Sequence, residues 1–105
     1  MFGFFKNLFG GGADVKELVA NGAVIIDVRT KGEFRQGHIR GAKNIPLQNI
    51  EGQLITIQKM NKMIVTCCMS GARSGQAASF LKRNGVEAHN GGGWSRLQSK
   101  LRSNK

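Results

Sequence analysis

The residues best suited to chemistry in this chain are a cysteine, Cys68, and the six residues that follow it. An apolar run over residues 63–67 leads into this segment and a helix-like stretch follows it, which is typical of a turn from a strand into a helix. Such a turn directs several backbone N–H groups toward one point, where they and the helix dipole favour negative charge. A thiol at that point ionises more readily than a free cysteine, whose pKa is about 8.5, and the thiolate is the nucleophilic form. We therefore predict that Cys68 is a nucleophile at the mouth of an anion-binding loop, whose other members are Met69, Ser70, Gly71, Ala72, the cation Arg73, and Ser74.

The preceding cysteine, Cys67, has two interpretations. It is either a small side chain that packs in the core at the end of a strand, or a redox partner that forms a strained vicinal disulfide with Cys68. Adjacent cysteines cannot staple a small domain, because bridging neighbours removes almost no loop entropy, and this usage fits a reducing, cytoplasmic compartment. With two cysteines and only two histidines, His38 and His89, we expect no zinc site.

Length and composition indicate one small soluble domain. The chain has 105 residues, of which 40% are hydrophobic and 7% aromatic, values that argue against disorder or a fibre. No apolar run approaches the roughly 18 to 20 residues that span a bilayer, so we expect no integral membrane protein. The formal net charge of +10 favours an anionic partner or substrate. Recognisable nucleic-acid motifs are missing and no aromatic residues interleave with the basic ones, so we expect no specific nucleic-acid binding.

The first twelve residues form an appendage, because a Phe-rich start ends in a flexible run of three glycines. The segment lacks the charged start, the longer apolar centre and the cleavage site of a secretory signal. It is either a lead-in to the domain or a contact element. In the second case Phe2, Phe5 and Phe9, spaced three and four apart, form an apolar stripe for weak contact with a membrane or a protein. We expect the protein to be a monomer.

Strands alternate with helices along the rest of the chain. Asp14 with Glu17 three positions later predicts a helix that ends at Asn21-Gly22, and the β-branched run over residues 24–28 predicts a strand buried on both faces, which implies a parallel sheet. The pattern predicts an α/β fold with an open, mostly parallel sheet of about five strands and helices on both faces. Functional sites of such sheets gather at the carboxyl ends of the strands, where Cys68 falls. The other predicted elements are an edge segment at Ile45-Pro46, helices over residues 50–60, 75–84 and 94–101, and strands over residues 63–67 and 86–89.

Four motifs occur in the order typical of one protein family. They are Asp27-Val28-Arg29, a segment over residues 33–46 that contains Gly37-His38-Ile39, the cysteine loop, and Gly91-Gly92-Gly93-Trp94. Together they resemble a single-domain rhodanese over about residues 13 to 101. The resemblance implies a rhodanese-like domain over residues 13–105 that follows the appendage of residues 1–12.

This resemblance implies a sulfurtransferase that needs no cofactor or metal. Its cysteine, here Cys68, takes a sulfane sulfur from a small anionic donor such as thiosulfate and passes it, as a persulfide, to cyanide or a thiol acceptor. Four residues separate Cys68 from Arg73, as in the sulfurtransferase form, whereas related phosphatases have a loop one residue longer. Asp27 and Arg29 are expected to support the site from the neighbouring strand, with Arg29 pairing with Glu33.

Two other functions stay open on the sequence. One is a sulfur-carrier or interaction module with weak activity of its own. The other is a thiol redox protein that uses Cys67 and Cys68, in which Cys67 resolves or relays the modified sulfur. His38 lies in a Gly-His-Ile turn, where we expect it to bond to the backbone rather than act as a base.

Overall fold

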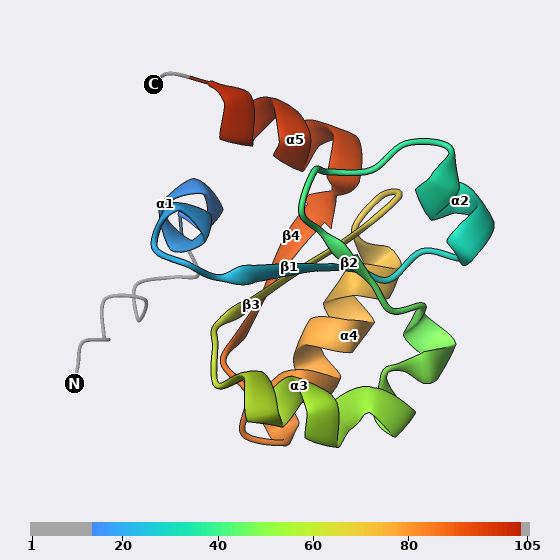
Figure 1. Ribbon diagram of the computed structural model, residues 1–105, viewed down its shortest axis with the longest axis vertical. Coiled ribbons are helices and arrows are strands. Elements are labelled where there is room, and N and C mark those ends of the chain that lie inside the picture. Colours follow the sequence, from blue (N-terminus) through green and yellow to red (C-terminus); the bar gives the residue numbers. More distant parts are fainter. Residues whose placement is uncertain (1–13, 104–105) are drawn as a thin grey trace.

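Four parallel strands form the centre of the structure, a computed structural model that describes residues 14–103 (Figure 1). Their spatial order is β2 (Lys43–Asn44), β1 (Val24–Asp27), β3 (Ile64–Cys68) and β4 (Ala88–Gly93). The two central strands, β1 and β3, carry the β-branched runs of the sequence. Such runs are typical of parallel strands that are covered on both faces.

Helices cover both faces of this sheet. On one face lie α1 (Val15–Ala20) and α5 (Trp94–Arg102), and on the other lie α3 (Leu54–Met60) and α4 (Ala72–Arg83) (Figure 1). The short α2 (Lys31–Arg35) lies beyond the carboxyl end of β1. The predicted fold class, an α/β parallel sheet with helices on both faces, is confirmed.

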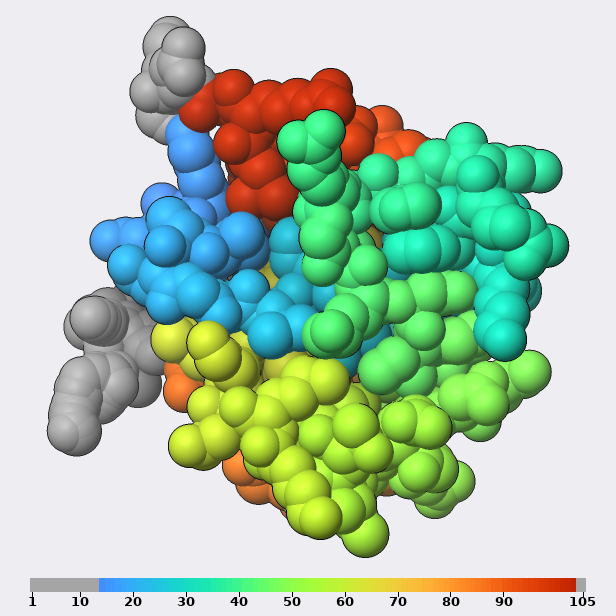
Figure 2. Space-filling model, viewed as in Figure 1, coloured from blue at the N-terminus to red at the C-terminus, as the bar shows by residue number. Residues whose placement is uncertain are grey.

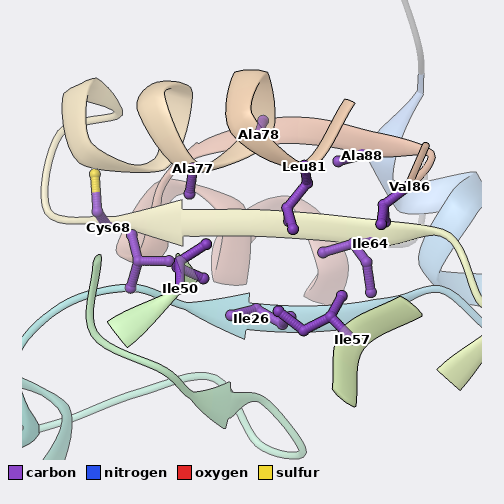
Figure 3. Close-up of a cluster of buried hydrophobic side chains, with 11 residues drawn as sticks. Ile26, Ile50, Ile57, Ile64, Cys68, Ala77, Ala78, Leu81, Val86 and Ala88 are labelled. Carbon is purple, nitrogen blue, oxygen red and sulfur yellow. The ribbon is translucent and has the colours of Figure 1, made fainter. Parts of the chain in front are cut away.

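Side chains of the central strands alternate between two hydrophobic clusters, because successive residues of a strand point to opposite faces. Ile64 and Cys68 of β3 belong to the cluster that α3 and α4 complete (Figure 3). Val65 and Cys67 belong to the cluster that α1 and α5 complete. The helices contribute Ile57, Ala77 and Leu81 to the first cluster and Val15 and Leu97 to the second.

The connection between α2 and β2 closes part of the second face. It contributes the buried Ile39 to the cluster of α1 and α5. In the space-filling view this segment, coloured green, adjoins the red α5 across the face of the molecule (Figure 2). The motif over residues 33–46 therefore folds across the sheet rather than away from it.

The expected number of strands was wrong, since residues 14–103 form a sheet of four rather than about five. The stretches between the strands fold as helices and turns instead. Residues 31–35 form α2, which was not predicted because five residues are too short to show a helical period, although Thr30 and Glu33 form a capping box there. Leu47–Asn49 and Glu51–Gln53 form 3-10 turns, so the helix predicted from residue 50 begins as α3 only at Leu54.

Other predicted boundaries also move. The edge strand β2 ends one residue before the predicted segment at Ile45-Pro46, and β3 includes Cys68 itself. Helix α4 begins three residues before the predicted start at Gly75, because small residues hide the beginning of the helix in the sequence. Strand β4 runs to Gly93, beyond the predicted end at residue 89. The sequence did not show this part of the strand because glycine has no intrinsic strand preference.

The predicted contact stripe of Phe2, Phe5 and Phe9 lies outside the described residues. Within residues 14–103, none of the helices is long and apolar enough to cross a membrane.

A test of the sheet packing uses Gly91, where β4 lies against β3. A Cβ atom at this position would lie 2.8 Å from the Thr66 carbonyl oxygen and 2.8 Å from the Val65 side chain. We expect Gly91→Ala to lower the free energy of unfolding by about 1 to 3 kcal/mol, the usual effect of overpacking. The control is Gly32→Ala in α2, where no neighbouring atom lies within 4 Å. Equal urea midpoints for the two variants would contradict the close approach of β4 to β3.

Candidate active site

Cys68 is the last residue of β3, and its side chain lies beneath the first turn of α4 at the carboxyl edge of the sheet (Figure 3). The residue is only 1% exposed. The chain reverses at Gly71, whose φ of 107° lies in the left-handed region that glycine adopts without strain. The loop packs closely on β4, because a Cβ atom at Gly93 would lie 2.8 Å from the Met69 carbonyl oxygen. The glycine pair thus shapes the loop around the sulfur.

Three donors or possible donors surround the Cys68 sulfur. The N–H groups of Gly71 and Ser74 donate to it over 3.0 and 3.3 Å, and the Ser74 hydroxyl lies 3.3 Å away. Burial alone would raise the pKa of the Cys68 thiol, but hydrogen bonds from the Ser74 side chain and from the backbone of Ser74, Gly71 and Ser70 together lower it below its usual value. The loop therefore favours a thiolate, as the sequence analysis predicts.

Cys67 has the opposite environment. It points to the other face of the sheet, where it is fully buried among the side chains of the α1 and α5 cluster. Burial, with the nearby Asp27 carboxylate, raises the pKa of its thiol to about 12. Both cysteines are free thiols. This placement favours the interpretation of Cys67 as a packing residue over that of a redox partner.

Arg73 is held by an ion pair with Glu33. Its two terminal guanidinium nitrogens donate to the two carboxylate oxygens over 2.9 and 3.1 Å, which joins the start of α4 to α2. The hydrogen bond from Arg73, followed by the backbone bond from Thr30, lowers the pKa of the Glu33 carboxyl to about 2. The expectation that Glu33 pairs with Arg29 was therefore wrong. Sequence spacing alone could not show which arginine lies opposite the carboxylate.

Arg29 forms a buried ion pair with Asp27 instead. Its guanidinium donates to both carboxylate oxygens, with contacts of 2.7 to 3.1 Å, and both side chains are nearly inaccessible. The same guanidinium donates to the backbone oxygens of Glu33 and Gly37 and stacks over the Trp94 ring at 4.6 Å. Arg29 thus joins the end of β1 to α2, the following turn and α5. This contact set fits the supporting role expected for Asp27 and Arg29.

Asn90 is a site residue that the sequence analysis missed. Its amide oxygen lies 2.7 Å from the Ser74 hydroxyl, and its amide nitrogen donates to the Gly71 carbonyl over 3.1 Å. Asn90 therefore contacts two residues of the cysteine loop from β4. The one signal in the sequence is a polar residue directly before the Gly91-Gly92-Gly93 run, at the end of a predicted strand.

The two histidines have partners other than the Cys68 sulfur. His38 Nδ1 lies 2.7 Å from the Phe34 carbonyl oxygen, and the two rings stack 3.7 Å apart, so this histidine bonds to the backbone as expected. His89 Nε2 lies 3.5 Å from the Glu87 carboxylate. Among residues 14–103, no three His, Cys, Asp or Glu side chains come together as metal ligands would.

An open groove runs beside the loop, between the end of β1 and the residues that follow β2. Its volume is about 570 Å³. Polar and charged side chains line it together with a few apolar ones, and the cations among them are Lys31 and Arg73. A second groove of about 630 Å³ shares Leu47 with the first and extends along α4. The surface next to the loop is thus open, and Lys31 adds positive charge to it, which suits the approach of an anion.

Comparison with known proteins places residues 12–100 in one family. The sequence profile of the Rhodanese-like domain matches residues 12–100. The uncharacterized protein YqhL of Bacillus subtilis is 39% identical over 85 residues, which are 79% of this chain and 67% of that protein. Thiosulfate sulfurtransferase PspE of Escherichia coli is 36% identical over 70 residues, 65% of this chain and 67% of the relative. The solved structure of the human single-domain sulfurtransferase TSTD1 is 29% identical with a TM-score of 0.69, over 85% of this chain and 92% of that one.

The two thiols should differ sharply in reactivity. In the variants Cys67→Ala and Cys68→Ala, which keep one thiol each, we expect iodoacetamide to label Cys68 with a pH midpoint below the value of about 8.5 for a free thiol. Cys67 should stay unlabelled through pH 10, because its pKa is about 12. Both thiols should react at the same rate in urea, and peptide mass spectrometry measures the labelling. Faster labelling of Cys67 in the folded protein would contradict the site.

The Glu33 and Arg73 pair should be visible in the pH dependence of stability. Because the folded-state pKa of Glu33 is about 2 and its usual value is 4.5, the pair stabilises the fold fully above pH 4.5 and loses this effect as the pH falls toward 2. We expect Glu33→Gln to lower the melting temperature at neutral pH, with a difference from the native chain that shrinks between pH 4.5 and 2.

The matched control for this measurement is Glu51→Gln, since Glu51 has no ion pair within residues 14–103. Its melting temperature should follow that of the native chain through the same pH range. A difference for Glu33→Gln that stays constant from pH 7 to pH 2 would show that the ion pair does not stabilise the folded protein.

Proposed function

Because this chain belongs to the rhodanese-like domain family, we propose that it is a sulfurtransferase that moves a sulfane sulfur through a persulfide on Cys68. The donor is thiosulfate or a persulfide, and the acceptor is cyanide or a thiol. The observation that carries the proposal is the convergence of the Gly71 and Ser74 donors on the Cys68 sulfur. Similarity to a thiosulfate sulfurtransferase and to a single-domain sulfurtransferase supports it.

The first half-reaction is a displacement at sulfur. The Cys68 thiolate attacks the outer sulfur of thiosulfate, a new S–S bond forms, and the S–S bond of the donor breaks. Sulfite leaves with the bonding electron pair. The loop N–H groups are fixed in position, so they stabilise the negative charge on the sulfur atoms without reorganising.

Arg73 has a secondary part in this step. The Glu33 carboxylate already neutralises its guanidinium, so Arg73 holds the loop against α2 and adds little net charge at the sulfur. The Ser74 hydroxyl and the backbone N–H groups of the loop supply the anion stabilisation. Lys31, which lines the same groove as Arg73, helps to attract an anionic donor.

The second half-reaction releases the sulfur. Cyanide or a thiolate attacks the outer sulfur of the Cys68 persulfide, and the Cys68 thiolate leaves. A thiol of low pKa is a better leaving group, so the hydrogen bonds that favour the thiolate also favour this step. The acceptor carries the outer sulfur away, as thiocyanate from cyanide or as a persulfide from a thiol, and the free Cys68 thiolate is restored.

The two half-reactions can be followed by mass spectrometry of the intact protein. After incubation with thiosulfate, the native chain and Cys67→Ala should each gain the mass of one sulfur atom, and Cys68→Ser should gain nothing. Addition of cyanide should remove that mass and produce thiocyanate, with turnover within tenfold for the native chain and Cys67→Ala.

Each alternative function gives a different result. A persulfide that forms but is not consumed by cyanide or a small thiol would indicate a sulfur carrier rather than an enzyme. The loss of two hydrogen atoms after mild oxidation, together with loss of activity in Cys67→Ala, would indicate a redox protein. Sulfur addition to Cys68→Ser would overturn the assignment of the nucleophile.

A further inference from the structure

The orientation of the Asn90 amide is fixed by two backbone groups. The Gly92 N–H can only donate, and it lies 2.9 Å from one end of the amide, which must be the oxygen. The Gly71 carbonyl can only accept, and it lies 3.1 Å from the other end, which must be the nitrogen. The absence of a side chain at Gly75 leaves room for this amide, because a Cβ atom there would lie 3.1 Å from the amide nitrogen. A flipped Asn90 would place like groups opposite each other at both contacts.

This orientation settles the direction of the next hydrogen bond. The Asn90 oxygen is an acceptor, so the Ser74 hydroxyl must donate to it across the 2.7 Å that separates them. A serine hydroxyl has one proton, and Ser74 is fully buried. While that proton is bonded to Asn90, the face of the hydroxyl toward Cys68 carries only lone pairs. The 3.3 Å contact between Ser74 and the sulfur then fits a neutral Cys68 thiol that donates to the hydroxyl.

We propose that Asn90 is a positioning residue that competes with the Cys68 sulfur for the single hydroxyl proton of Ser74. Ionisation of Cys68 then reverses the direction of the hydrogen bond between Ser74 and the sulfur. In the thiol form, Cys68 donates to Ser74 and Ser74 donates to Asn90. When the thiol proton leaves to solvent, the Ser74 hydroxyl rotates and donates to the sulfur anion. Bonds to an ionised acceptor are stronger than bonds to a neutral amide, so the thiolate wins the proton.

The rotation leaves no buried polar atom without a partner. The Asn90 oxygen keeps the Gly92 N–H after it loses the Ser74 proton, and the Asn90 residue is exposed to solvent. The Ser74 oxygen exchanges one acceptor for another without changing its place. The switch therefore exchanges two neutral hydrogen bonds, from the thiol to Ser74 and from Ser74 to Asn90, for one stronger bond from Ser74 to the thiolate.

Other charged groups near the sulfur do not take part in this exchange. Arg73 on α4, which is paired with Glu33 of α2, interacts electrostatically with Cys68. The neighbouring thiol of Cys67 also interacts with it. The remaining titratable residues on the strands beside β3 are Asp27 of β1, which is paired with Arg29, and His89 of β4, which lies near Glu87.

A consequence follows for sulfur transfer, and it rests on the proposed function. The Cys68 sulfur is anionic as the attacking group in the first half-reaction and again as the leaving group in the second. In both states the Ser74 proton points to the sulfur, and in the resting thiol it points to Asn90. With Asn90 present, Cys68 stays protonated over a wider pH range than it would beside Ser74 alone. This limits the reactivity of the resting thiol.

The test is a thiol titration in four proteins, all in the Cys67→Ala background, and it requires no sulfur transfer. They are the otherwise native chain, Asn90→Leu, Ser74→Ala and the double variant, each followed by ultraviolet absorbance of the thiolate and by the pH profile of alkylation by iodoacetamide. We expect Asn90→Leu to lower the titration midpoint and raise the thiolate fraction below the midpoint about threefold to tenfold. Ser74→Ala should raise the midpoint, and Asn90→Leu should then have no effect on it.

Each of the other outcomes overturns the proposal. An unchanged or raised midpoint in Asn90→Leu would show that Asn90 does not compete for the proton. An equal shift with and without the Ser74 hydroxyl would show that Asn90 acts only by shaping the loop. Circular dichroism checks the fold of each variant, and Asn90→Ala replaces Asn90→Leu in the cycle if the larger side chain prevents folding. Failure of sulfur transfer would leave these titrations unaffected, so the two proposals fail separately.

Discussion

The structure depends on holding backbone N–H groups around a sulfur atom that is almost closed off from water. A buried thiolate without donors would be costly, and burial by itself raises the pKa of Cys68. The Ser74 hydroxyl and the N–H groups of Ser74 and Gly71 reverse that preference only while they point at the sulfur. Three features around the loop keep these donors in place. They are the left-handed glycine in the turn, the glycine end of β4, and the two arginine ion pairs, Arg29 with Asp27 and Arg73 with Glu33.

The two arginine ion pairs differ in burial. Arg29 and Asp27 are withdrawn from water, and a buried ion pair of this kind gains little net stability because both charges lose their hydration. Its contribution is geometric, since Arg29 also binds two carbonyl oxygens beyond β1 and stacks on Trp94. The pair of Arg73 and Glu33 lies nearer the surface, where it fastens α4 to the helix that Arg29 has positioned. The pair of Arg73 and Glu33 therefore depends on the buried pair of Arg29 and Asp27.

Much of this arrangement could be predicted from the sequence. The β-branched runs of β1 and β3 define the parallel sheet, and the order of the motifs places Cys68 in its loop. Contacts between distant residues could not be predicted. Nothing in the spacing shows that Glu33 pairs with Arg73 rather than Arg29, because that choice depends on the path of the chain after β1. Asn90 was missed for the same reason, since its partners are brought to it by the register of β4 against β3.

The register of β3 decides which cysteine is the nucleophile. Adjacent strand residues face opposite ways, so a slip of one residue would bring Cys67 under α4 and bury Cys68 against α1 and α5. Thr66 opposes that slip. It is fully buried on the α4 side, where its hydroxyl donates to the Ser74 carbonyl oxygen over 2.8 Å. On the other face the same hydroxyl would lie among apolar side chains such as Val15 and Leu97, at a cost of about 1 to 3 kcal/mol for an unsatisfied polar group. A buried threonine that takes no part in the chemistry thus helps to place the reactive sulfur in the loop and its neighbour in the core.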